Sequence, residues 1–240
     1  MTKGTINRFA INVPRPNAGT PQMLSAAEVN ARLAELGVSH NHELQDAMQR
    51  ARDAIGVEPN NERAWRALAH GQMLQEKYAE ALQSVDRLSA QPTLSAQGYS
   101  DCAFVLAAIA HHADAGMNEA ALSQRARDAF EKSIAINTDD PAPLIEFATM
   151  IMSEKDVQAA RKLIPVMEQT ASGNPRDSDL ARSTAHLCAA IGDADCALKF
   201  ARAWQKYSKT DAERDNATAY LSHLSANIER RSAAALDQPN

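Results

Sequence analysis

Apolar residues recur at helical spacing along most of this chain. Within residues 60–88, Trp65, Leu68 and Ala69 fall on one face of a helix, because residues three and four apart share a face. The same spacing returns one helix later, at Tyr78, Ala81, Val85 and Leu88. The stretch therefore predicts a hairpin of two amphipathic helices that bury their apolar faces against each other.

The hairpin pattern repeats in register along the chain. Small alanines stand where paired helices would cross, and larger residues beside them would fill the grooves between helices. One repeat carries extra residues around 111–121, so we expect both of its helices to be lengthened and joined near Gly116. The five stretches with this pattern are 28–61, 62–95, 96–140, 141–174 and 178–211.

The stretch 62–95 resembles a tetratricopeptide repeat (TPR), a helix–turn–helix unit of about 34 residues. It departs from the family at Glu76, where a turn glycine is usual, and at Gln72, where a large residue is usual. The resemblance implies an all-α, right-handed superhelix of TPR-like repeats. It also implies that the first helix of each unit lines a concave groove that holds a peptide of a partner.

The two ends of the chain differ from the repeats. Phe9, Ile11 and Val13 alternate like a short strand, which would lie along the first repeat or belong to a preceding domain. Near the other end, an apolar stripe on a charged helix is typical of the cap that repeat stacks need. The predicted organisation is an extended arm or linker at 1–24, a solenoid at 25–209, and a capping helix with a tail at 210–240.

Two sequence patterns predict where terminal helices begin. Ser25 is followed by Glu28, and Thr210 is followed by Glu213. Both pairs match the capping box, in which a hydroxyl accepts a backbone N–H at the start of a helix. We therefore expect one helix to begin after Ser25 and the capping helix to begin after Thr210.

Composition agrees with an all-α fold, and the net charge disfavours nucleic acid and anionic membranes as partners. The chain is 45% hydrophobic but only 5% aromatic, with nine glycines and ten prolines, so strands and their turns are poorly supported. The net charge of −5 gives no basic field for nucleic acid or anionic membranes. The sequence has no apolar run of membrane-spanning length and no N-terminal signal core. We therefore expect a cytoplasmic protein, unless the chain was excised from a longer exported one.

The three cysteines are too few and too scattered for a disulfide scaffold. Cys102 lies in an apolar run and is expected in the core. Cys188 and Cys196 could meet across a helical hairpin, either as a disulfide or as two small buried thiols. Buried thiols are the commoner arrangement, so the pattern favours them.

Catalytic and metal-binding patterns find little support. The glycines are isolated, so there is no phosphate-binding loop, and the nucleophile-elbow and HExxH patterns are absent. The histidine pairs His40 with His42 and His111 with His112, the latter near Asp114, do not supply the three or four converging ligands of a metal site. We expect no metal, no cofactor and no enzymatic activity within this chain.

The TPR resemblance points to a set of groove-lining positions on the first helix of each unit. Arginine recurs at the fifth position in three units, and a guanidinium forms a planar fork suited to carboxylates. The lysine and asparagine set of the family's carboxylate-clamping members is absent. The candidate groove residues are Arg32, Arg63, Arg66, His70, Met73, Phe104, Ile145, Thr149, Met152, Arg182 and His186.

Two interpretations of these arginines stay open. They could bind an acidic segment or a free C-terminus of a partner, with Phe104, Ile145 and Met152 seating apolar anchors. Alternatively, they could solvate exposed helix faces or pair with acidic residues of the next repeat. The primary functional hypothesis is a non-catalytic scaffold that binds a protein or peptide. The alternatives are a regulatory or substrate-presenting part of an enzyme whose catalytic part lies outside this chain, and a homo-oligomer that buries its own groove.

Overall fold

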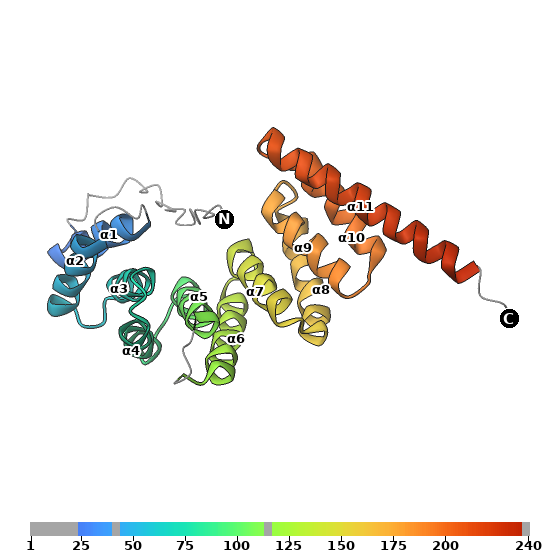
Figure 1. Cartoon of the computed structure of the whole chain (residues 1–240). Coiled ribbons are helices and arrows are strands. Elements are labelled where there is room, and N and C mark those ends of the chain that lie inside the picture. The colour runs from blue at the N-terminus through green and yellow to red at the C-terminus, as the bar shows by residue number, and fades with distance from the viewer. Residues whose placement is uncertain (1–23, 40–43, 113–116, 237–240) are drawn as a thin grey trace. The chain divides into compact units, whose positions relative to one another are not determined.

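The computed structural model describes residues 24–39, 44–112 and 117–236, and these fold into eleven α-helices (Figure 1). The chain divides into two compact units, which meet in sequence between Ser133 and Ile134. We describe each unit by itself. The strand-like pattern at Phe9, Ile11 and Val13 lies outside the described residues.

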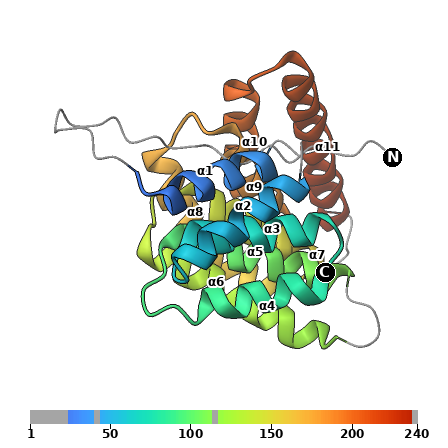
Figure 2. The ribbon, with the colours of Figure 1, turned by 90° about the vertical axis from the view of Figure 1, so that its left-hand side faces the viewer.

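Unit 1 consists of helical hairpins in which consecutive helices pack side by side. Helix α1 contacts α2 and α3, α3 contacts α4 and α5, and α4 contacts α5. Figure 2 looks onto this unit with the α1–α2 hairpin nearest the viewer. Its helices are α1 (Ala26–Ser39), α2 (Leu44–Val57), α3 (Glu62–Leu74), α4 (Tyr78–Ser89), α5 (Ala96–His112) and α6 (Glu119–Ile136), the last of which ends just beyond the division.

Unit 2 repeats the same arrangement. Helix α7 packs on α8 and α9, α9 packs on α8 and α10, and α10 packs on the last helix. Its helices are α7 (Pro141–Glu154), α8 (Val157–Gly173), α9 (Ser178–Ala190), α10 (Ala194–Tyr207) and α11 (Asp211–Leu236). In both units, the odd-numbered helices up to α9 are the first helices of their hairpins.

Side-chain caps define where the first helices begin. The N-terminal N–H groups of a helix have no partner within the helix, so a side-chain oxygen before the first turn stabilises it. Ser25 and Thr210 accept the backbone N–H groups of Glu28 and Glu213 at 3.1 Å each, which confirms both predicted helix starts. The corresponding caps of three other helices are Asn61 for α3, Asp140 for α7 and Asp177 for α9.

Three hairpin turns, at α3–α4, α7–α8 and α9–α10, use one recurrent backbone conformation. Glu76, Lys155 and Gly192 stand at the same position of their repeats and have φ values of 60°, 55° and 83°. At each turn, the following N–H donates to the carbonyl five residues earlier, which is the Schellman ending of a helix. These bonds join Lys77 to Gln72, Asp156 to Ile151, and Asp193 to Cys188.

Alanines allow the helices to approach closely. Ala31 on α1, Ala54 on α2 and Ala64 on α3 are fully buried against one another. A side chain of one carbon leaves little between two helix backbones, so larger residues beside the crossing fill the remaining space. The alanine positions of the repeat pattern are therefore core contacts, as the sequence predicts.

The third hairpin, α5–α6, has long helices of 17 and 18 residues. The Ser133 hydroxyl on α6 donates to the carbonyl of Ala96 at 2.8 Å, and the Lys132 ammonium lies over the Tyr99 ring. These contacts hold the C-terminal end of α6 against the start of α5. Gly116, where we expect the connecting loop, lies outside the described residues.

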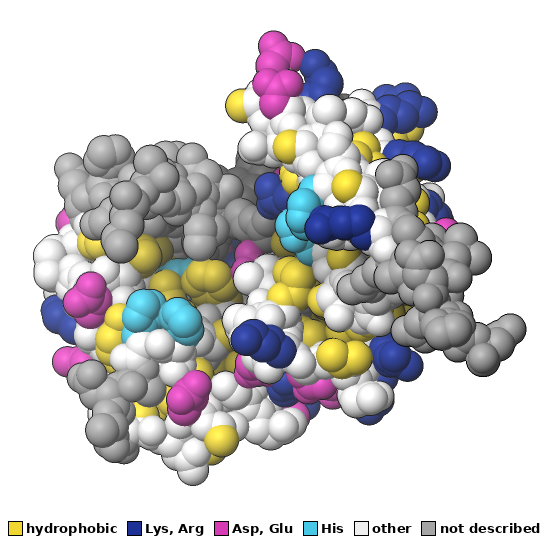
Figure 3. Space-filling model, turned by 45° about the vertical axis from the view of Figure 1, so that its right-hand side comes forward, with side chains coloured by type: hydrophobic (Ala, Val, Ile, Leu, Met, Phe, Trp, Pro, Cys, Tyr) yellow, Lys and Arg dark blue, Asp and Glu magenta, His cyan; other side chains and the backbone are white. Residues whose placement is uncertain are grey.

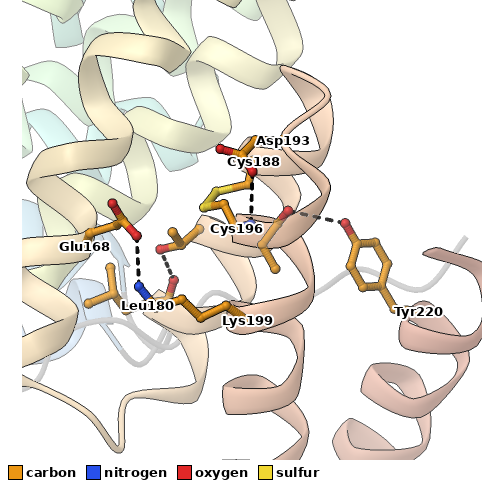
Figure 4. Close-up of a disulfide and its surroundings, with 9 residues drawn as sticks. Glu168, Leu180, Cys188, Asp193, Cys196, Lys199 and Tyr220 are labelled. Carbon is orange, nitrogen blue, oxygen red and sulfur yellow. Dashed lines mark hydrogen bonds and ion pairs between the residues drawn. A yellow bond between two sulfur atoms is a disulfide. The ribbon is translucent and has the colours of Figure 1, made fainter. Parts of the chain in front are cut away.

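Cys188 and Cys196 form a disulfide, so the expected pair of buried thiols is wrong. Cys188 lies near the end of α9 and Cys196 in the first turn of α10, with their Cα atoms 5.7 Å apart (Figure 4). The hairpin brings the two side chains together because the Schellman turn and the Asp193 cap start α10 directly beside α9. Cys102, by contrast, is a buried thiol in α5, as predicted.

Helix α11 confirms the predicted C-terminal capping helix. It has 26 residues, against 14 in α10. Ala217 is fully buried, and the Tyr220 hydroxyl donates to the carbonyl of Ala185 on α9 at 3.4 Å (Figure 4). The N-terminal half of α11 therefore covers the last hairpin.

Candidate protein-binding surface

The candidate residues of unit 1 lie on the first helices α1, α3 and α5. Arg32 is on α1, while Arg63, Arg66, His70 and Met73 follow one another along one face of α3 at spacings of three and four. Phe104 is on the neighbouring helix α5. The structure therefore places these side chains on adjacent helices within a single unit.

A chain of opposite charges crosses these three helices, and we call it the charge ladder (Arg32, Glu28, Arg63, Glu35, Arg66, Asp101). Arg32 pairs with Glu28 at 2.6 Å, and Arg63 contacts Glu28 at 3.6 Å and hydrogen-bonds to Glu35. Three guanidinium groups therefore alternate with three carboxylates. The ladder carries no net formal charge.

Arg66 is the enclosed member of the ladder. Its Nε donates to Asp101 at 2.5 Å and its Nη2 lies 3.3 Å from Glu35, and only 9% of its side chain is exposed. Burial alone would lower the pKa of Arg66, but the carboxylates of Asp101 and Glu35 outweigh it and raise the pKa. Arg66 is thus a fixed cation that holds α1, α3 and α5 together.

Next to the ladder lies an aromatic contact. The rings of His70 on α3 and Phe104 on α5 are 5.0 Å apart, and both residues are partly buried. Burial lowers the pKa of His70; Asp101 opposes this shift and Arg66 adds to it. His70 is therefore a neutral ring at neutral pH. Met73, one turn further along α3, is also partly exposed.

In unit 2 the candidates have different surroundings. Ile145 is buried in the core, and the Thr149 hydroxyl donates to the Ile145 carbonyl within α7. Met152 is partly exposed near the end of α7. Arg182 on α9 pairs with Asp179 at 2.9 Å, in the same helix. Ile145 is therefore a core residue, while Met152 and Arg182 are accessible.

His186 belongs to an aromatic cluster that joins the last three helices. Its ring on α9 stacks on Tyr220 of α11 at 4.6 Å, and the Trp204 ring of α10 lies 5.8 Å from both. Burial, and secondarily the charge of Arg182, lower the pKa of His186. This histidine therefore packs the capping helix onto the last hairpin.

Sequence reasoning missed the acidic partners of the ladder. Glu35 lies 31 residues before Arg66, and Asp101 lies 35 residues after it, about one repeat away in each direction. Opposite charges one repeat apart on first helices are the signal that would have found them. The structure pairs Arg63 and Arg66 with carboxylates of neighbouring repeats, whereas Arg32 and Arg182 pair with a carboxylate on their own helix.

Metal-ligating side chains and the free thiol were also located. Across the part of the chain that the structure describes, no group of His, Cys, Asp and Glu could hold a metal ion. His40, His42 and Asp114 lie outside that part. Burial raises the pKa of the Cys102 thiol to about 12, so it stays protonated and unreactive.

On the face shown in Figure 3, basic and acidic side chains are interspersed, with hydrophobic side chains between them. Within the described ranges, no helix has both the length and the apolar character needed to cross a bilayer.

Comparisons with known proteins identify the fold. No protein-family model matches the chain, and no curated protein matches it. A thermophilic TPR protein of Thermus thermophilus superposes with a TM-score of 0.60 at 14% identity, covering 83% of this chain and 98% of that one. PilW, a type IV pilus biogenesis factor, gives a TM-score of 0.61 at 14% identity, covering 87% and 94%.

A third solved structure is YrrB, described as a TPR protein with an unusual peptide-binding site. Its TM-score is 0.56 at 14% identity, with 80% of this chain and 92% of that one covered. Together the three likenesses confirm the predicted fold class, an all-α solenoid of TPR-like repeats. At 14% identity, these likenesses are evidence for the fold and not for a shared function.

Proposed function

We propose that this chain is a non-catalytic scaffold that binds a peptide or partner protein on the exposed side of its first helices. The observation that carries the proposal is the charge ladder beside the His70–Phe104 contact. Side chains from α1, α3 and α5 are held there by one another, so a partner would bind a surface that is already ordered. A role as the regulatory or substrate-presenting part of an enzyme would use the same surface.

The charge ladder limits which arginines could bind an acidic partner. Arg66 is enclosed between two carboxylates, so it is not available to a partner. Arg63 and Arg32 expose 36% and 48% of their side chains, and they could bind a partner carboxylate alongside Glu28. We therefore expect only a modest preference for acidic segments, carried by the accessible end of the ladder.

An array of peptides in matched acidic and neutral versions tests this surface. We expect Arg63→Gln to weaken binding of the acidic versions several-fold, because it removes one accessible guanidinium. Higher salt should weaken the same peptides, since the charges are near the surface. Fluorescence anisotropy of the strongest peptides would give the dissociation constants.

Arg87→Gln is the matched control, because Arg87 is an exposed arginine on the second helix α4. Binding that Arg63→Gln and Arg87→Gln weaken equally would reflect overall charge and would sink the proposal. The proposal also fails if peptides bind but neither Arg63→Gln nor Phe104→Ala changes their affinity. Circular dichroism on each variant separates loss of binding from loss of fold.

The disulfide bears on where the scaffold works. Cytosolic thiols are kept reduced, and disulfides are rare in the cytosol. The Cys188–Cys196 bond therefore supports an oxidising compartment for this chain. Lysing the cells directly into denaturant that contains an alkylating reagent would decide, since a chain kept reduced would be labelled at all three cysteines and a disulfide-bonded one only at Cys102.

A further inference from the structure

A hollow lies at the edge of unit 2 where the hairpin turns are. It has a volume of about 280 Å³ and is lined by the end of α7, the start of α8 and the end of α9. Ile151, Met152 and Leu187 form its apolar wall, and Val157, which is 42% exposed, stands at its mouth. One water needs only roughly 10–15 Å³ of such space, so the hollow has room for a side chain.

A second hollow of about 230 Å³ occupies the same place one repeat later. The α9–α10 turn and α11 form its walls, with Ala194, Leu224 and Ile228 among the lining residues. Its rim includes His223 and Asn227. Like the first hollow, it lies between the turn of one hairpin and the next first helix.

The two hollows have equivalent linings in the repeat register. Units 141–174 and 178–211 begin 37 residues apart, and Met152, Lys155 and Val157 correspond at that offset to Ala189, Gly192 and Ala194. All six residues line their respective hollows. The hollow is therefore a recurrent feature of the turn edge of unit 2.

Unit 1 carries a larger side chain at the equivalent position. The residue equivalent to Val157 and Ala194 in the repeat 62–95 is Tyr78. Its ring stacks on His112 of the next first helix, α5, with ring centroids 6.0 Å apart and planes nearly parallel. An aromatic ring thus bridges a hairpin turn and the next first helix in unit 1, where valine and alanine leave space in unit 2.

From this comparison we infer that the turn edge of unit 2 is a second binding surface, at which a partner segment inserts two aromatic side chains. Each inserted ring would take the place that Tyr78 takes in unit 1. The apolar walls favour the buried ring by the area removed from water. Lys155, an exposed cation at the first hollow, can lie over the face of an inserted ring. This surface belongs to unit 2 and the charge ladder to unit 1, so the inference goes beyond the proposed function.

Small aromatic probes test the hollows directly. N-acetylphenylalaninamide and N-acetylleucinamide would be titrated into the full chain, with methyl NMR signals of Met152 and Leu224 as the readout. We expect saturable shifts with the aromatic probe at lower concentrations than with the aliphatic one. Equal response to both probes, or no shift at either methyl, would overturn the inference.

Filling the hollows provides the matched variants. Val157→Tyr and Ala194→Tyr install the residue type that unit 1 carries, so each should abolish the probe response at its own hollow only. Val57→Tyr is the control, because Val57 is an exposed valine at the end of α2 and lines neither hollow. If the filled variants still respond as the unmodified chain does, the probes bind elsewhere and the inference fails.

A single partner segment is tested by linking two phenylalanines through Gly/Ser spacers of increasing length. The best spacer should bind at least tenfold more tightly than N-acetylphenylalaninamide, because the second ring binds intramolecularly. No gain in affinity at any spacer length would exclude one segment that fills both hollows.

Light scattering tests whether a second copy of this chain fills the first hollow instead. A dimer that Val157→Tyr dissociates would show this and would refute a partner segment.

Discussion

At the scale of single residues, the partners of charged side chains are not evident from the sequence. Arg66 occupies a position that lines the groove in the TPR resemblance, yet it exposes only 9% of its side chain, between Glu35 and Asp101. The periodicity of the sequence indicates which face of α3 the residue occupies. It does not indicate which charges a neighbouring helix brings to that face, because the partners lie about one repeat away.

Removing Arg66 should destabilise unit 1 strongly. Arg66→Ala leaves Glu35 and Asp101 near-buried without their main cation, and breaking a buried ion pair typically costs about 3–5 kcal/mol. A triple variant, Glu35→Met, Arg66→Met and Asp101→Leu, should recover most of that loss, because it leaves no unpaired charge. Urea unfolding gives the free energies. If Arg66→Ala is no less stable than Arg63→Ala, the network around Arg66 is not buried.

His186 should make stability depend on pH. Its pKa in the folded state is lowered, first by burial and then by Arg182, whereas in the unfolded chain it is about 6.5. The unfolded state therefore takes up the proton more readily, so stability is level above about pH 6.5 and falls as the pH drops below it. The charge that acts on the ring is that of Arg182 on α9, which pairs with Asp179.

His186→Phe keeps a ring against Tyr220 and Trp204 but removes the titration. We expect its stability to decline less than that of the unmodified chain between about pH 6.5 and pH 5. His70, whose pKa is also lowered, contributes equally to both proteins and cancels in the comparison. Parallel curves of urea midpoint against pH would exclude a role for His186.

At the scale of elements, the turns of three hairpins share one backbone conformation although their residues differ. Three hairpins place a residue with positive φ at the same register position, and only Gly192 is a glycine. Glu76 and Lys155 adopt this left-handed conformation although side chains disfavour it. The helical pattern of the flanking residues thus determines the turn more strongly than the local preference of the turn residue.

Exchanges at this position should change stability in opposite directions. Glu76→Gly should stabilise the α3–α4 hairpin by about 0.5–1 kcal/mol, since it relieves a left-handed side chain against some loss of chain entropy. Gly192→Ala should cost about 1 kcal/mol, because an added Cβ meets no atom within 4 Å and only the backbone penalty remains. Denaturant midpoints measure both, and two shifts of the same sign would be inconsistent with the recurrent turn.

The hairpins themselves were predictable from the sequence, whereas some of their links were not. Trp65, Ala69, Tyr78 and Ala81 repeat with the helical period because they are core contacts, and core contacts are what periodicity records. The bond between Cys188 and Cys196 depends on redox surroundings as well as on proximity, and composition favoured two thiols. A helix pattern therefore predicts that two residues lie close, but it does not predict which covalent state they adopt.

At the scale of the whole molecule, the chain has two compact units, and each carries one of its two tryptophans. Trp65 reports on unit 1 and Trp204 on unit 2. In repeat proteins each hairpin contacts only its neighbours, so a perturbation stays close to its origin. Local stability can therefore be measured separately in the two units.

Reducing the disulfide should destabilise unit 2 alone. The bond closes a loop across only eight positions, for which chain entropy predicts a loss of about 2–3 kcal/mol on reduction. In Trp65→Phe and Trp204→Phe variants, reduction should lower the urea midpoint reported by Trp204 and leave that of Trp65 nearly unchanged. Thiol titration in denaturant should find one reactive cysteine before reduction and three after it. Three before reduction would show that the bond is absent.

The fold class followed from repeats that recur along the chain, but the hollows behind the second proposed surface became visible only in the structure. The hollows at Val157 and Ala194 are defined by what is missing relative to Tyr78, and this becomes visible only when the turn edges of both units are compared. Sequence identifies the equivalent positions. It does not show that the smaller residues leave space instead of letting the helices close in.

The charge ladder of unit 1 has a consequence for how the chain reaches its native order. Alanine-rich faces of similar hairpins are nearly interchangeable in shape, so a collapsing chain could stack them in a wrong sequence or skip one. In such an arrangement Arg66 would meet an apolar face, and a buried charge without its partner costs several kcal/mol. By pairing with Arg66, Glu35 and Asp101 favour the native order of the hairpins over other orders, so charge as well as shape specifies how the repeats stack.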